Sequence, residues 1–126
     1  MLKKEIERIK KEAQAKGIHP LKYYAEKKEY PAGDIILLRR KYIDCRYFFE
    51  NLYGVFESIP EISRKYGTEY RIFKTDGLGY EIREGWELIK LFYTKEEALK
   101  WLKEHIPRRC IYECSGGLRI YNHDYI

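Results

Sequence analysis

The 126-residue chain is predicted to adopt an α+β fold, with N-terminal helices, including one long buried helix, packed on an antiparallel sheet. Three observations support this class. Apolar residues recur at helical spacing in the first half of the chain. From Gly67 onward, β-branched and aromatic residues alternate with turn residues, as in strands. A helix-capping sequence then interrupts these strands. We expect the sheet to comprise a three-stranded meander and a C-terminal hairpin, with a helix between them along the chain.

The length corresponds to a single domain, because two ordinary hydrophobic cores need a longer chain. Within residues 1–126 we distinguish a basic helical arm over 1–33, core helices over 34–67 and a β-rich half over 68–126. The β-rich half contains a helix over 95–106.

Two helices are predicted in the basic arm. Leu2, Ile6, Ile9 and Ala13 form one apolar stripe, which indicates a helix over 2–16 that ends at Gly17. Pro20 then suits the first turn of a second, short helix, which ends before Pro31 and Gly33.

The core segment begins at Asp34, a residue suited to capping a helix. Seven apolar residues follow at three-four spacing: Ile35, Leu38, Tyr42, Cys45, Phe49, Leu52 and Phe56. This spacing predicts one long buried helix over 34–57. A competing interpretation makes 34–39 a short strand and begins the helix near Lys41, because the run of Ile and Leu fits either structure. Pro60 opens a further short helix that ends at Gly67.

In the β-rich half we predict strands over 68–75, 80–84 and 86–93, with a turn over 76–79. Thr94 and Glu97 then form a capping box that opens the amphipathic helix. Strands over 110–114 and 118–122 flank a Ser-Gly-Gly turn and form the hairpin.

Positive charge is concentrated in the basic arm. The net charge is +5 and the pI about 9.0. Residues 1–33 hold nine Lys and Arg against five acids. Such an arm suits a polyanion, because each cation that meets a phosphate releases a counterion. Glu7 with Lys11 and Glu12 with Lys16 are also four residues apart, so pairing along a solvated helix explains many of these charges without a partner.

The favoured function is a small non-enzymatic nucleic-acid-binding protein, with DNA or RNA as partner. Thirteen tyrosines, many beside Lys or Arg, supply rings for base stacking. The residues expected to contact phosphates are Lys3, Lys4, Arg8, Lys10, Lys11, Arg39, Arg40, Lys41, Arg108 and Arg109, and those expected to stack are Tyr23, Tyr24 and Tyr121. The alternative is a protein-binding module, such as an inhibitor or accessory factor of a mobile element, that acts through an aromatic interface and forms a homodimer.

Two segments resemble nucleic-acid-binding motifs. Ser58–Gly67 resembles the first helix and turn of a helix-turn-helix unit, which implies a recognition helix over Thr68–Lys74 and a wing over Tyr80–Tyr93. The alternative is a surface turn of helix that leads into a strand. Trp86–Trp101 resembles the strand-to-helix join of small three-stranded nucleic-acid-binding modules, although its capping box alone explains that join.

Metal binding has one weak candidate. His105, Cys110, Cys114 and His123 are residue types that bind zinc, and a hairpin brings their segments together. The favoured interpretation of the three cysteines is buried free thiols, so no cofactor is predicted. Catalytic motifs such as a phosphate-binding glycine loop or a nucleophile elbow do not occur, which favours a non-enzymatic protein.

The sequence also bears on location and host. It has no apolar run of the ~18 residues that a membrane span needs and no apolar signal region, so a soluble cytoplasmic protein is expected. Amide residues and Met are scarce while Lys, Glu, Ile and Tyr are abundant, which is typical of thermophile proteins.

This composition predicts a melting temperature above the range of about 45–65 °C that is usual for mesophile domains. Circular dichroism during heating of the purified chain measures it. A transition within the mesophile range would contradict the thermophile interpretation.

Overall fold

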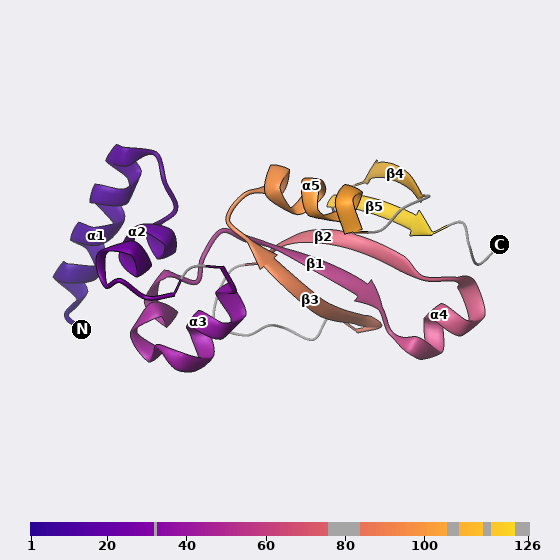
Figure 1. Ribbon diagram of the computed structural model, residues 1–126, viewed down its shortest axis with the longest axis horizontal. Helices are drawn as coiled ribbons and strands as arrows, with labels where there is room; N and C mark the ends of the chain where they lie inside the picture. Colours follow the sequence, from indigo (N-terminus) through magenta and orange to yellow (C-terminus); the bar gives the residue numbers. More distant parts are fainter. Residues whose placement is uncertain (32, 76–83, 106–108, 115–116, 123–126) are drawn as a thin grey trace. The chain divides into compact units, whose positions relative to one another are not determined.

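The computed structural model describes residues 1–31, 33–75, 84–105, 109–114 and 117–122, with side chains up to residue 105. The fold is α+β (Figure 1). The chain divides into two compact units, Met1–Glu50 and Asn51–Ile126. The first unit is helical and the second contains the sheet.

The described elements of the first unit are the helices α1 (Lys3–Lys16), α2 (Pro20–Lys27) and α3 (Ile35–Lys41) and the 3-10 helix η1 (Ile43–Phe48). Gly17 ends α1 in the left-handed conformation, at φ 70°. Pro20 opens α2, and the Asp34 side chain accepts hydrogen bonds from the first amides of α3. The sequence prediction is therefore confirmed for the first two helices and for the Asp34 cap.

The long helix predicted over 34–57 is wrong. Helix α3 ends at Lys41, because Tyr42 adopts an extended conformation with φ −121° and ψ 95°. After η1 the chain forms strand β1 (Leu52–Ser58). The competing prediction of a strand over 34–39 is also wrong, because those residues belong to the helical segment.

The apolar spacing led to the wrong prediction of a long helix because β1 is buried on both faces. Leu52, Val55 and Phe56 are each 1% exposed or less, although neighbouring residues of a strand point to opposite sides. A strand covered on both sides has no polar alternation, so its apolar residues also fit a helical pattern. Gly54 shows how tight the packing is: an added Cβ would lie 2.8 Å from the Phe56 ring and 2.9 Å from Leu88 Cδ1.

A carboxylate and two tyrosine hydroxyls organise the core of the first unit. Asp44 Oδ2 accepts hydrogen bonds from the hydroxyls of Tyr24 and Tyr30. The Tyr24 ring packs against Phe48 at 4.8 Å between centroids, and Tyr30 stacks on Tyr42 at 3.8 Å. Burial raises the pKa of Asp44, but the hydrogen bonds from Tyr24, from Tyr30 and from the backbone, together with the charge of Lys28, lower it more, so the pKa lies below its ordinary value.

Cys45, next to this network, has a buried thiol. Its side chain is fully shielded, and burial raises its pKa to about 11. The thiol is therefore neutral at pH 7 and packs as a small apolar group. This confirms the prediction of a buried free thiol for Cys45.

In the described part of the second unit, five strands form one antiparallel sheet in the order β3-β1-β2-β5-β4 (Figure 1). Besides β1, these strands are β2 (Glu69–Thr75), β3 (Trp86–Phe92), β4 (Arg109–Cys114) and β5 (Gly117–Asn122). Helix α4 (Pro60–Tyr66) connects β1 to β2, and α5 (Lys95–His105) follows β3. One side of the sheet packs on α5 through a buried cluster made of Val55, Ile72, Phe92, Ala98 and Leu102.

The predicted meander is wrong in its order. The strands predicted over 68–75 and 86–93 are β2 and β3, but β1 lies between them, and Val55 has Ile72 and Lys90 as its cross-strand neighbours. Most of the strand predicted over 80–84 lies outside the described residues. The apolar spacing places 52–58 in the long helix, so the sequence pattern does not predict the central strand.

The last elements follow the prediction. Helix α5 lies between the third and fourth strands, and β4 pairs with β5 as the C-terminal hairpin. The Glu97 amide donates to Thr94 Oγ1 at 3.2 Å, which confirms the cap. The second bond of the cap differs from a capping box, because the Thr94 hydroxyl donates to the Glu97 carboxylate.

Helix α4 confirms the short helix predicted from Pro60. The recognition helix implied over Thr68–Lys74 is wrong, because residues 69–75 form β2. The segment is thus a surface turn of helix that leads into a strand. No helix in the described ranges is long and apolar enough to span a bilayer.

Asp44 makes the stability of the first unit depend on pH. Because its folded pKa is lowered, ionised Asp44 stabilises the fold above its ordinary pKa of 3.8, and this contribution is lost as the pH falls through the lowered value. We expect Asp44→Ala to lower the free energy of unfolding of the first unit by about 1–3 kcal/mol at neutral pH. As the pH falls below the ordinary pKa of 3.8 and through the lowered one, the difference from the wild type should shrink.

Hydrogen exchange of the full chain, read at the amides of residues 1–50, measures this effect. Glu26→Ala is the control, because Glu26 lies exposed on α2. The same pH dependence in both variants would contradict a special role for Asp44.

Candidate functional site

The net charge of the protein resides in the first unit. Residues 1–50 contain 13 Lys and Arg against 8 Asp and Glu, whereas residues 51–126 contain 12 of each. The structural boundary therefore coincides with an electrostatic one. The first unit carries +5 and the second is neutral, so a polyanion is attracted to the first unit.

Helix α1 presents a cationic ridge, which we define as Lys4, Arg8 and Lys11. These side chains are exposed and spaced by four and three residues, so they line one face of the helix. The buried residues Ile9 and Ala13 occupy the opposite face. Among the described residues, no carboxylate lies within ion-pair distance of the three ridge side chains.

Lys10, which the sequence groups with the ridge, has a structural partner instead. Its ammonium lies 3.4 Å from the Glu50 carboxylate. The Glu50 backbone carbonyl also lies 2.6 Å from His19 Nε2, next to the start of α2. Lys10 therefore helps to hold the end of the first unit against its helices, although the pair is solvent-exposed and contributes little stability.

The other predicted phosphate contacts are distributed over several elements. Lys3 is exposed at the start of α1. Arg40 and Lys41 are exposed in the last turn of α3, while Arg39 is half-buried there. The helix dipole by itself favours cations in this last turn, so their presence there does not require a ligand. Arg108 and the side chain of Arg109 lie outside the described residues.

Two of the three tyrosines predicted to stack on bases, Tyr23 and Tyr24, are engaged within the fold. Tyr24 is only 2% exposed. The Tyr23 ring has the ammonium groups of Lys16 and Lys27 at 5.2 and 5.4 Å from its centroid. Its hydroxyl donates to Glu12 at 2.8 Å and lowers the pKa of that carboxyl. The side chain of the third, Tyr121, lies outside the described part of the chain.

The structure shows two exposed aromatic rings that the sequence reasoning did not select. Tyr47, on η1, is 46% exposed and follows the exposed Arg46. Tyr66, at the end of α4, is 75% exposed, and the Lys65 ammonium lies 5.5 Å from its ring centroid. Their sequence signal, a cation followed by Tyr, is the same as that of the half-buried Tyr23 and Tyr42, so only burial distinguishes them.

For the zinc candidates, only His105 has a described side chain. Its Nδ1 lies 2.9 Å from the Trp101 carbonyl oxygen, and its ring stacks on Trp101. Cys110 and Cys114 belong to β4, but their side chains and His123 lie outside the described residues. Within the described ranges, no group of three or more His, Cys, Asp or Glu could hold a metal ion.

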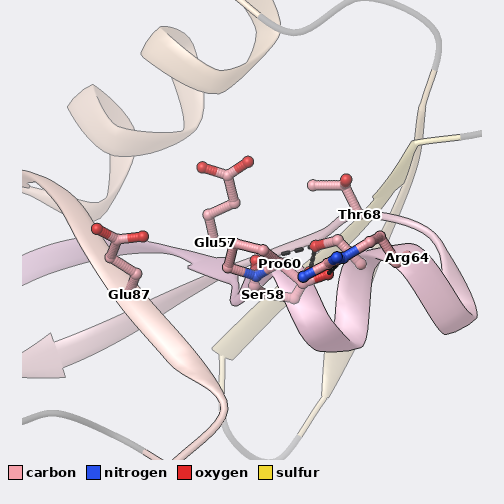
Figure 2. A pocket seen from close by; sticks show the side chains of 7 residues that line it. Glu57, Ser58, Pro60, Arg64, Thr68 and Glu87 are labelled. Atoms are coloured by element: carbon pink, nitrogen blue, oxygen red, sulfur yellow. Dashed lines mark hydrogen bonds between the residues drawn. The ribbon is translucent and has the colours of Figure 1, made fainter.

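The second unit contains a cavity of about 370 Å³ at the junction of β1, α4 and β3 (Figure 2). It is lined by Glu57, Ser58, Pro60, Ser63, Arg64, Thr68 and Glu87. These residues come from the C-terminal end of β1, from α4 and the residue before β2, and from the start of β3.

Two serines form a hydrogen-bonded joint beneath this cavity. Ser63 Oγ donates to the Ser58 carbonyl at 3.0 Å, so the 2.8 Å bond between the two hydroxyls must be donated by Ser58. Ser58 Oγ also accepts from the Glu69 amide at 3.0 Å. Ser58, which is 4% exposed, thereby joins the end of β1 to α4 and to the start of β2.

Comparison with protein families, with curated proteins and with solved structures finds no match for this chain. The functional argument therefore depends on the geometry of its own residues.

The serine joint predicts unequal effects of two similar substitutions. Ser58→Ala removes, at a position that is 4% exposed, both the acceptor of the Glu69 amide and the donor of the bond to Ser63, so we expect it to lower the free energy of unfolding of the second unit by about 1–3 kcal/mol. Ser63→Ala should cost less, because Ser63 is half-buried and water replaces its bonds. Tryptophan fluorescence during urea unfolding reports on this unit, since Trp86 and Trp101 both belong to it. Equal losses would refute the ranking.

Proposed function

We propose that this protein binds nucleic acid without catalysing a reaction, and that it does so through phosphate contacts of its first unit. The observation that carries the proposal is the cationic ridge Lys4, Arg8 and Lys11, set opposite the buried face of α1 in the unit that holds the whole net charge. A helix with one face packed and the other cationic can approach a polyanion without disturbing its own core.

The dimensions of the ridge suit a nucleic-acid backbone. Lys4 and Lys11 are seven residues apart, which corresponds to about 10 Å along a helix axis. Duplex DNA presents roughly six phosphate charges over that length. Three cations on one helix face therefore match a local excess of phosphates, and each contact releases counterions.

The state of the tyrosines determines the mode of binding that we propose. Tyr24 is buried and Tyr23 is occupied by two lysines, so base stacking by these rings does not support the proposal. Tyr47 is the exposed ring of the first unit, next to Arg46. The protein is thus proposed to contact the backbone mainly, with little sequence preference and no requirement for single strands.

The test is fluorescence anisotropy of labelled duplex and single-stranded DNA and RNA at several salt concentrations between about 50 and 200 mM. The wild type should bind with an affinity that falls steeply with salt. The triple variant Lys4→Gln/Arg8→Gln/Lys11→Gln should weaken binding to all sequences and reduce the salt slope for duplex DNA by about 2–3.

Two controls separate the ridge from general charge. Lys74→Gln/Lys100→Gln/Lys103→Gln removes three exposed cations of the second unit and should leave the slope nearly unchanged. Lys10→Gln, whose cation pairs with Glu50, should have a smaller effect than Lys11→Gln. If both triple variants lost affinity and salt slope equally, net charge and not the ridge would explain the binding. An absence of binding at low salt would overturn the proposal in favour of a protein partner.

A further inference from the structure

Thr68 has an unsatisfied hydroxyl at the cavity of the second unit. The residue is 6% exposed and lines the cavity, yet within the described part of the chain its hydroxyl makes no hydrogen bond. In Figure 2 the side chains of Thr68 and Glu57 rise on the same side, and no hydrogen bond reaches Thr68. Buried polar groups nearly always have a partner, so this hydroxyl points to a partner other than the described residues.

Two carboxylates on the cavity wall also have no counter-charge among the described residues. Glu57 on β1 and Glu87 on β3 are direct cross-strand neighbours, and their side chains rise on the same side of the sheet (Figure 2). Like charges in this arrangement destabilise a sheet. The Tyr70 hydroxyl donates to Glu57 at 3.3 Å, but within the described ranges no Lys or Arg lies at ion-pair distance from either carboxylate.

A guanidinium completes the lining. Arg64 on α4 is exposed, and its Nε donates to the Pro60 carbonyl at 3.3 Å. This bond holds the side chain along the helix and leaves the terminal N–H groups available. A guanidinium presented in this way binds a carboxylate through paired hydrogen bonds.

From these three features we infer that the cavity binds a free basic α-amino acid, of the class of lysine and arginine. Besides two serine hydroxyls that are bonded to the protein, the lining offers two carboxylates, one guanidinium and the Thr68 hydroxyl, and such a ligand carries two cationic groups and one carboxylate. The cationic groups face Glu57 and Glu87, the carboxylate faces Arg64, and Thr68 supplies the remaining hydrogen bond. A volume of about 370 Å³ lies within the range of small-molecule sites.

A divalent cation fits this lining less well. Arg64 places a fixed positive charge on the same cavity, and the described residues contain no group of three acidic, His or Cys side chains that could coordinate a metal. The inference concerns the second unit only and does not depend on nucleic-acid binding by the first.

The experiment is an NMR titration of the isotope-labelled full chain with L-lysine and L-arginine. We expect saturable shifts at the amides of Thr68 and Glu87, with a Kd of about 0.1–1 mM, because two of the charged lining groups are exposed to water. L-norleucine lacks the second cation and cadaverine lacks the carboxylate, so each should bind about tenfold more weakly.

Variants separate binding from folding. Thr68→Val removes a hydroxyl without a partner, so it should leave the thermal stability of the ligand-free protein unchanged or raise it, while weakening binding about fivefold. Thr68→Ser should retain binding. Glu87→Gln and Arg64→Gln should each weaken binding as well, whereas Glu61→Gln, on the exposed side of α4 and outside the lining, should not.

The inference is overturned by the absence of saturable shifts with either amino acid, or by norleucine and cadaverine binding as well as lysine. A loss of stability in Thr68→Val would also overturn it, because the hydroxyl would then have a structural role. Equal weakening by Glu61→Gln would show that only the general charge of the surface matters.

Discussion

Burial of β1 on both faces is the constraint on which the second unit depends. Val55 packs into the cluster under α5, while Phe56 meets the Phe73 ring at 5.3 Å on the other side. Both neighbouring strands are aligned by their pairing with β1, and Gly54 permits close approach where a side chain would collide with Leu88. The cavity lies where β1 ends, so the same strand that organises the core also positions Glu57 and Ser58.

The first unit is a small helical segment with many charged residues. Its tyrosines contact several of these charged groups. Tyr24 and Tyr30 hold Asp44, and Tyr23 lies against two lysine ammonium groups and donates to Glu12. These rings shield or offset charge inside the unit, whereas the ridge cations on α1 have no ion-pair partner among the described residues. Aromatic residues beside cations thus support the fold here, and the proposed recognition of nucleic acid is assigned to the cations.

The two proposals concern separate units and opposite charges. The first unit concentrates cations on a convex helix face, a geometry that suits a long polyanion. The second unit is neutral as a whole but sets two carboxylates and a guanidinium around a cavity, a geometry that suits a small molecule with charges of both signs. The two serine hydroxyls of the lining are hydrogen-bonded to the protein, so the proposed ligand is assigned to the Thr68 hydroxyl, which has no partner among the described residues.

Local signals in the sequence determined the α+β class, the helices that begin at Lys3 and Pro20, the Asp34 and Thr94 caps and the C-terminal hairpin. Each of these depends on neighbouring residues, through capping bonds or turn chemistry. The tertiary structure alone decided that 52–58 is the central strand, because burial on two faces erases the alternation that marks a strand. It also decided that Tyr24 is buried and that Lys10 pairs with Glu50, since these depend on segments distant in sequence. For the same reason the charge of the basic arm was readable from the sequence, whereas the cavity, assembled from three separate elements, was not.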